Sequence, residues 1–115
     1  MKKIIIIAAV AVLAIAAYFL ISGKSAPLSG SPETHYVTIE NYAFSPAEIT
    51  VKAGDVVIWE NKDSTEHTVT SDAGAFDSGL FGKGLKFERT FGSAGSFPYH
   101  CTPHPQMTGA VTVAE

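Results

Sequence analysis

The sequence contains a single cysteine, Cys101, among 115 residues. One cysteine cannot form a disulfide within its own chain, so no internal disulfide framework stabilises the fold. Four roles remain for Cys101. These roles are a buried apolar residue, a link to another molecule, a nucleophile and a metal ligand.

Basic residues are scarce after the first thirty positions. From Glu33 onward there are five basic and eleven acidic residues, a net charge of 5 − 11 = −6. Nucleic-acid-binding domains need a basic surface, so we expect no nucleic-acid partner. We expect four acidic residues to form a solvated surface, with steering of a basic partner as the alternative: Asp63, Glu66, Asp72 and Asp77.

Residues 35–115 also lack any amphipathic helical pattern of useful length. Short β-type runs separated by turn residues predict an all-β fold, an antiparallel sandwich or barrel. Trp59 is expected to anchor its core, and the glycine-rich residues 73–84 to form an irregular excursion. The predicted strands are residues 36–39, 48–51, 56–60, 67–70, 85–91, 96–100 and 109–113.

One long apolar run lies at the start of the chain. Residues 4–21 carry no charge, and Lys2 and Lys3 precede them. As a helix this run would be about 27 Å long, close to the ~30 Å hydrocarbon core of a bilayer. The SGKSAP that follows is unlike a signal-peptide cleavage site, so we favour an uncleaved anchor over a removed signal. The two lysines would stay in the cytoplasm and place the rest of the chain outside it.

These patterns divide the chain into three parts. We expect residues 1–21 to form a hydrophobic helix that serves as a membrane anchor or signal segment. Residues 22–34 are small, polar and interrupted by two prolines, which is typical of a flexible linker. Residues 35–115 would form one domain, a monomer in the periplasm or on the outer face of the cytoplasmic membrane.

The segment YHCTPHPQM, residues 99–107, gathers unusual chemistry around the cysteine. Two residues separate Cys101 from His104, and two more separate His104 from Met107. Taken singly, cysteine and methionine are most often core residues. The shared spacing instead places a thiolate, an imidazole and a thioether on one tight loop. This pattern favours a metal site, with His67 from an earlier strand as the fourth donor.

The donor types indicate which metal we expect. Cu(I) prefers thiolate and thioether, imidazole suits both copper oxidation states, and two histidines, one cysteine and a weak methionine form blue copper electron-transfer sites. Zinc sites typically lack methionine. We therefore predict one type 1 copper cycling between Cu(II) and Cu(I) in a protein that is not an enzyme. The predicted ligands are His67, Cys101, His104 and, as the axial donor, Met107.

Three other functions stay open at this point. A copper carrier or storage protein would use the same ligands. A cysteine hydrolase would use Cys101 as its nucleophile, but the sequence shows neither an orienting third group nor an oxyanion hole. In a purely structural, membrane-tethered sandwich the spacing would be accidental.

Residues 48–113 resemble the cupredoxins. EITVKAGDVVIWEN leads to the first histidine in EHTV, and CTPHPQM is similar to the short ligand loop of the amicyanin type. The resemblance implies a cupredoxin-like antiparallel Greek-key β-sandwich with one type 1 copper. It also implies outer-sphere electron transfer between redox proteins that serve as donor and acceptor, with His104 as the exposed exit for the electron.

Two positions differ from the amicyanin pattern. Thr68 stands where these proteins often have an asparagine that joins the two ligand loops, and we expect a threonine to hydrogen-bond less extensively. Gln106 replaces an apolar aromatic residue beside His104, so partner docking is expected to differ. Of the remaining histidines, His100 should point away from the copper and His35 should be solvated.

Overall fold

The computed structural model of the protein describes residues 31–115. The expected N-terminal helix and residues 22–30 of the expected linker lie outside the described residues. Pro32–Glu115 form one compact unit. The described residues contain strands and turns but no helix, so none of them forms a helix that could cross a membrane.

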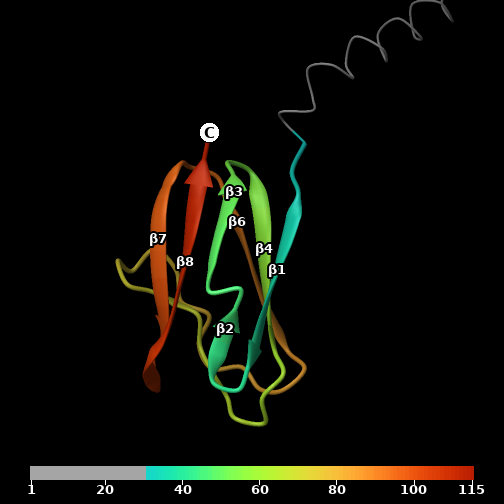
Figure 1. The fold of residues 1–115 in the computed structure, drawn as a ribbon, viewed down its shortest axis with the longest axis vertical. Coiled ribbons are helices and arrows are strands. Elements are labelled where there is room, and N and C mark those ends of the chain that lie inside the picture. The colour runs from blue at the N-terminus through green and yellow to red at the C-terminus, as the bar shows by residue number, and fades with distance from the viewer. Residues whose placement is uncertain (1–30) are drawn as a thin grey trace, which may run out of the picture. The chain divides into compact units, whose positions relative to one another are not determined.

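Eight strands form two four-stranded sheets (Figure 1). The first sheet has the order β2–β1–β4–β6 and the second the order β3–β8–β7–β5. The strands of the first sheet are β1 (Thr34–Glu40), β2 (Ala43–Ser45), β4 (Asp55–Asn61) and β6 (Lys86–Phe91). Those of the second sheet are β3 (Glu48–Lys52), β5 (Thr70–Ser71), β7 (Gly95–Cys101) and β8 (His104–Ala114). The predicted all-β sandwich is confirmed.

The prediction that the sandwich is antiparallel is wrong, because each sheet contains one parallel pair. β1 runs parallel to β4, with Thr34 opposite Val56, and β3 runs parallel to β8, with Glu48 opposite Ala110. The chain leaves the first sheet after β2, adds β3 to the second sheet, and returns as β4 beside β1. A strand that returns after such an excursion can run parallel to the earlier strand. Local sequence patterns do not indicate this direction.

The core lies between the sheets and is built by alternation along the strands. In β4, Val57 and Trp59 point inward and are fully buried, while the alternate residues Val56, Ile58 and Glu60 are half-buried. Trp59 meets Tyr99 of the opposite sheet edge-on, with ring centroids 5.5 Å apart. Such aromatic pairs contribute roughly 0.5–1.5 kcal/mol beyond the area they bury. The prediction of Trp59 as a core anchor is confirmed.

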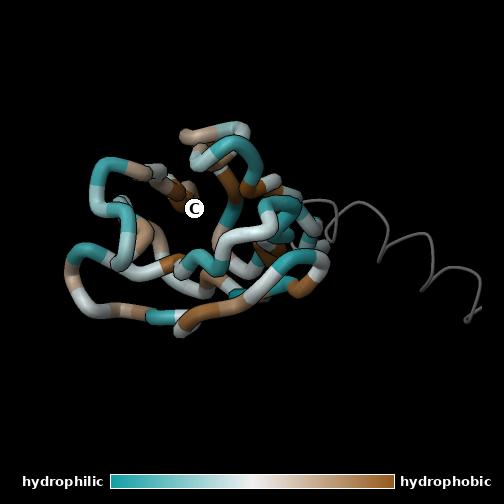
Figure 2. The backbone as a smooth tube through the Cα atoms, turned by 90° about the horizontal axis from the view of Figure 1, so that it is seen from below, coloured by the Kyte–Doolittle hydropathy of each residue, from teal (hydrophilic) through white to brown (hydrophobic). Residues whose placement is uncertain are grey.

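Two turns that matter for function lie at the same end of the sandwich. In Figure 1 the turn after β1 and the turn between β7 and β8 are both at the lower end. Figure 2 views the molecule from that end, and hydrophobic and hydrophilic residues follow one another closely along the chain. β1 itself begins at the opposite end, so a single strand connects the two ends of the domain.

Candidate metal centre

Three of the four predicted donors meet at one point. One donor atom from each of His67, Cys101 and His104 lies within 4.8 Å of the other two. The sulfur of Cys101 is 3.5 Å from the Nδ1 of each histidine. That separation suits donors that share one ion at the bond lengths of about 2.0–2.3 Å found for imidazole and thiolate ligands of zinc. His67 and Cys101 are fully buried, and His104 is partly exposed.

The β7–β8 hairpin positions two of these donors. Cys101 ends β7, His104 begins β8, and the two residues pair across the intervening Thr102 and Pro103. The ladder is irregular between His100 and Cys101, and irregularities of this kind re-aim side chains near functional sites. Prolines on both sides of His104 restrict the backbone there.

His67 comes from a separate part of the chain, after the end of β4. Its N–H donates to the carbonyl of Phe81 (3.2 Å), and the Phe81 N–H donates back to the His67 carbonyl (3.0 Å). The buried amide of Asn61 fixes the same loop, because its Nδ2 donates to the carbonyls of Thr65 (2.9 Å) and Phe81 (2.8 Å). The predicted strand 67–70 is therefore only a bridge followed by the short β5.

Met107 lies on β8, three residues beyond His104, and is 3% exposed. The structure therefore places its thioether in the interior, on the strand that begins with a candidate ligand.

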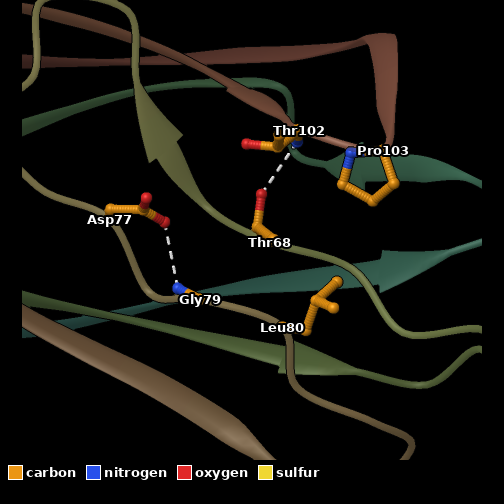
Figure 3. Close-up of a pocket in the computed structure, with 6 residues that line it drawn as sticks. All are labelled: Thr68, Asp77, Gly79, Leu80, Thr102 and Pro103. Atoms are coloured by element: carbon orange, nitrogen blue, oxygen red, sulfur yellow. Dashed lines mark hydrogen bonds between the residues drawn. The ribbon is translucent and has the colours of Figure 1, made fainter.

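Thr68 joins the two ligand segments, contrary to the expectation that it would hydrogen-bond less extensively than an asparagine. Its N–H donates to the sulfur of Cys101 (3.4 Å), and its hydroxyl accepts the N–H of Thr102 (2.8 Å; Figure 3). The same hydroxyl is 2.8 Å from the hydroxyl of Thr70, which in turn donates to Asp77 (3.1 Å). Thr68, together with the hydroxyl of Thr70, thus connects the two ligand segments as an asparagine was expected to do.

Asp63 supports His67 from outside the donor set. Its Oδ2 lies 2.9 Å from the Nε2 of His67, so this contact leaves Nδ1 free to face the sulfur. Burial raises the pKa of Asp63, but hydrogen bonds from the Tyr42 N–H, His67 and the Asn41 N–H outweigh it and hold the pKa below its ordinary value. The prediction that Asp63 belongs to a solvated surface is wrong, whereas Glu66, Asp72 and Asp77 are exposed as expected.

Tyr42 is a neighbour of the site that the sequence did not reveal. Its ring lies edge-on to both imidazoles, with centroids 5.2 Å from His67 and 4.9 Å from His104. It reaches them from the turn between β1 and β2, and no spacing rule relates that turn to the ligand loop. The one available signal is the pair Asn41–Tyr42 between two β-type runs, which is compatible with a two-residue turn.

A cavity of about 330 Å³ lies beside the ligand hairpin (Figure 3). Thr68 is buried, and Leu80 is exposed at the surface. The lining residues are Thr68, Asp77, Gly79, Leu80, Thr102 and Pro103. The cavity therefore makes Thr68, which hydrogen-bonds Cys101, accessible from the surface. Cys101 itself is buried.

The other two histidines form ion-pair contacts elsewhere. His100 Nδ1 lies 2.6 Å from an oxygen of Asp72, outside the donor cluster. His35 is 29% exposed, and its Nε2 lies 2.9 Å from Asp55, which is almost completely buried. The prediction that His35 is solvated is therefore wrong.

His35, Asp55 and Glu33 form a second group of potential metal donors among the described residues. Hydrogen bonds already account for this group. The two oxygens of Asp55 accept the N–H groups of Glu33 and Lys52, each at 2.9 Å, in addition to the contact with His35. These bonds lower the pKa of Asp55 from 3.8 to about 2. Burial of Asp55 raises the pKa, but by less than the hydrogen bonds lower it. We call the group of Glu33, His35 and Asp55 the Asp55 latch.

The chemistry of the main cluster fits copper and argues against a nucleophile. A thiolate with two imidazoles offers the mixed soft and intermediate donors that suit both copper oxidation states. Cys101 is fully buried, so neither a substrate carbon nor a second cysteine can reach its sulfur without a structural change. A hydrolytic cysteine would need that access.

Comparison with known proteins agrees with this chemistry. Residues 33–114 match the copper binding proteins of the plastocyanin/azurin family, and the chain belongs to this family. The resemblance to cupredoxins of the amicyanin type is confirmed, and with it the copper cofactor. Amicyanin from Paracoccus denitrificans is 40% identical over 82 residues, which cover 67% of this chain and 63% of that protein. The chain thus matches less than two thirds of that relative's length.

Two further similarities extend the comparison. Amicyanin-alpha from Methylorubrum extorquens is 35% identical over 108 residues, 90% of this chain and 87% of that protein. A solved Cu(I) structure of an amicyanin variant superposes with a TM-score of 0.66 at 34% identity, covering 70% of this chain and 81% of that one. The fold described above is therefore shared with a solved copper protein.

Proposed function

We propose that the protein is a type 1 blue copper electron-transfer protein with His67, Cys101, His104 and axial Met107 as ligands. The observation that carries the proposal is the cluster of one buried cysteine sulfur 3.5 Å from two histidine Nδ1 atoms. Copper bound there would supply a one-electron Cu(II)/Cu(I) couple. In this proposal the protein makes and breaks no substrate bonds.

The protein's own residues supply a fixed and dry environment. Burial of His67 and Cys101 excludes water, and the Thr68 N–H stabilises the charge on the cysteine sulfur. Asp63 fixes the orientation of His67 through Nε2. Because these contacts do not depend on the oxidation state of the metal, they should keep the donors in place as the electron arrives and leaves. His104, the only partly exposed donor of the three, would face the partner.

The proposal includes extracytoplasmic redox proteins as electron donor and acceptor, and a monomeric carrier held at the membrane by residues 1–21 through a linker at 22–34. The apolar run after two lysines supports the anchor and the location. The acidic balance of −6 from Glu33 onward supports a basic surface on at least one partner.

Titration of the purified protein with Cu(II), followed by visible absorption and EPR, tests the proposal. We expect an intense blue colour and a narrow copper hyperfine splitting at one equivalent, because the cysteine sulfur would be bound to copper. Cys101→Ser should abolish both. A pale complex with wide splitting in the wild type would overturn the proposal. Rapid loss of copper to a chelator during redox cycling would favour a carrier instead.

A further inference from the structure

Tyr42 occupies a backbone position that disfavours tyrosine. It is the second residue of the two-residue turn that joins β1 to β2, in which Glu40 pairs with Ala43. Asn41 and Tyr42 have φ angles of 55° and 57°. Two-residue turns with positive φ at both positions favour an asparagine followed by glycine, and a bulky side chain there is strained.

The strained turn brings the Tyr42 ring into contact with both candidate histidine ligands. The interplanar angles are 85° with His67 and 82° with His104, and the two imidazole centroids lie 5.1 Å apart. Three rings therefore pack against one another edge to face, a favourable arrangement for aromatic pairs. Tyr42 remains 50% exposed, so burial of apolar surface does not by itself explain its placement.

Three hydrogen bonds hold Tyr42 in this position. Asp63 accepts the N–H of Asn41 at 2.8 Å and the N–H of Tyr42 at 3.0 Å. The Tyr42 hydroxyl lies 2.8 Å from the hydroxyl of Thr65. The Asp63 oxygen that accepts from Tyr42 also contacts His67. One carboxylate thus holds both the turn that carries the ring and the first histidine.

We propose that Tyr42 is a positioning residue whose ring fixes the orientation of His67 and His104 before copper binds. The copper part of this inference rests on the proposed function. Backbone strain of this kind is found at functional sites, where surrounding contacts maintain it. Residues that orient metal ligands typically change metal affinity 10–100-fold when they are replaced.

The test compares Tyr42→Leu with the wild type in the full-length protein, first without copper. Relaxation-dispersion NMR of the imidazole carbons of His67 and His104 should show increased exchange in the variant, because both rings lose their edge contact with Tyr42. In the copper-loaded protein, release of copper to a chelator should be about tenfold faster.

Three further variants isolate the contribution of the ring. Tyr42→Phe keeps the ring and the backbone bond to Asp63 and loses the hydroxyl contact with Thr65, so in both measurements it should change much less than Tyr42→Leu. Tyr42→Gly suits the turn and lacks the ring, so it should reproduce the effects of Tyr42→Leu even if the leucine variant folds poorly. Tyr36→Leu removes an exposed tyrosine elsewhere on β1 and should change neither measurement.

Unchanged imidazole exchange and copper release in Tyr42→Leu and Tyr42→Gly would overturn the proposal. Equal effects in Tyr42→Phe or in Tyr36→Leu would also overturn it, because the ring would then not be the cause. A wild type that binds no blue copper would refute the proposed function. The NMR comparison without copper would still test the positioning role.

Discussion

Asp63 shows how a residue outside the donor set can control a ligand. It contacts His67 Nε2 and the backbone N–H groups of Asn41 and Tyr42. When Nε2 carries the proton, Nδ1 has a lone pair for the metal, and a carboxylate partner makes that imidazole a stronger donor. A stronger donor stabilises Cu(II) more than Cu(I), so Asp63 should lower the reduction potential.

Replacement of Asp63 by asparagine tests this effect. If the affinity for Cu(II) falls tenfold more than that for Cu(I), Asp63→Asn raises the reduction potential by about 60 mV. Cyclic voltammetry would measure the shift. Glu66→Gln removes a neighbouring exposed charge and should produce a much smaller change. Equal shifts in the two variants would assign the effect to charge alone.

Replacement of Met107 gives a second prediction at the scale of single residues. Met107→Leu conserves volume, so the fold should persist, but it removes the proposed weak axial donor. Loss of a donor disfavours Cu(II) more than Cu(I), and the potential should rise by tens of millivolts, about 60 mV for each tenfold difference in affinity. A lower potential in voltammetry would contradict the assignment of Met107 as an axial ligand.

The donors were predictable from the sequence, and most of their supporting residues were not. Cys101, His104 and Met107 lie within seven residues of sequence, so spacing and residue type are enough to connect them. Tyr42 lies about twenty residues from Asp63 and reaches the site only in the folded chain. Asp63 is four residues from His67, but the local sequence does not show that its carboxylate contacts the imidazole. Thr68 stands beside His67 in the sequence, but its bonds to Cys101 and Thr102 depend on the approach of the hairpin.

At the scale of the elements, β7 and β8 must lie close together for Cys101 to reach the site. A Cβ atom at Gly109 would lie 2.4 Å from the Cζ and hydroxyl oxygen of Tyr99. Tyr99, which is buried, stands opposite Gly109 in the ladder and two residues before Cys101. The absence of a side chain at position 109 therefore lets the tyrosine cross β8.

Gly109→Ala should destabilise the copper-free protein by about 1–3 kcal/mol, as overpacked cores generally do. Urea denaturation would measure the difference. The displaced Tyr99 should also shift Cys101 and broaden the EPR spectrum of the copper form. Gly92→Ala is the matched control, because a Cβ there meets nothing within 4 Å, and it should change stability by no more than about 0.5 kcal/mol. Equal stability of the two variants would contradict the packing argument.

Regular strands were easier to predict than the pairing between them. The apolar run around 56–60 and the alternating run around 96–100 occur as β4 and β7. The three-residue β2 was missed because so short a run has no periodicity. Residues 67–70 alternate in sequence, but the neighbouring glycine-rich segment takes their hydrogen bonds, as in Ser78 N–H to the Val69 carbonyl. That segment is irregular, as predicted.

At the scale of the whole molecule, the two ends of the sandwich differ in function. The metal centre and the Tyr42 turn lie where β1 ends, and the Asp55 latch lies where β1 begins. The latch joins the start of the domain to the β3–β4 turn through the N–H groups of Glu33 and Lys52. It therefore contributes to stability rather than to the chemistry of the site.

The latch should produce a measurable dependence of stability on pH. The pKa of Asp55 is lowered from 3.8 to about 2, so between these values the unfolded chain binds more protons than the folded chain. The stabilisation is fully present above about pH 4 and is lost as the pH falls toward 2. In urea denaturation of the copper-free protein, the difference in unfolding free energy between wild type and Asp55→Asn should shrink as the pH falls from about 4 to about 2. A constant difference would contradict the argument, and the exposed Glu48→Gln serves as the control.

The placement of latch and metal centre at opposite ends of β1 has a practical consequence. Seven residues of strand span about 23 Å, and changes at sites more than about 10 Å apart usually have additive effects. Exchange, shortening or fusion of the residues before Glu33, which would preserve the latch, is therefore expected to leave the potential of the proposed copper site unchanged. In the proposed function, the domain would thus be a transferable redox module, with the copper at one end and the preceding residues joined at the other.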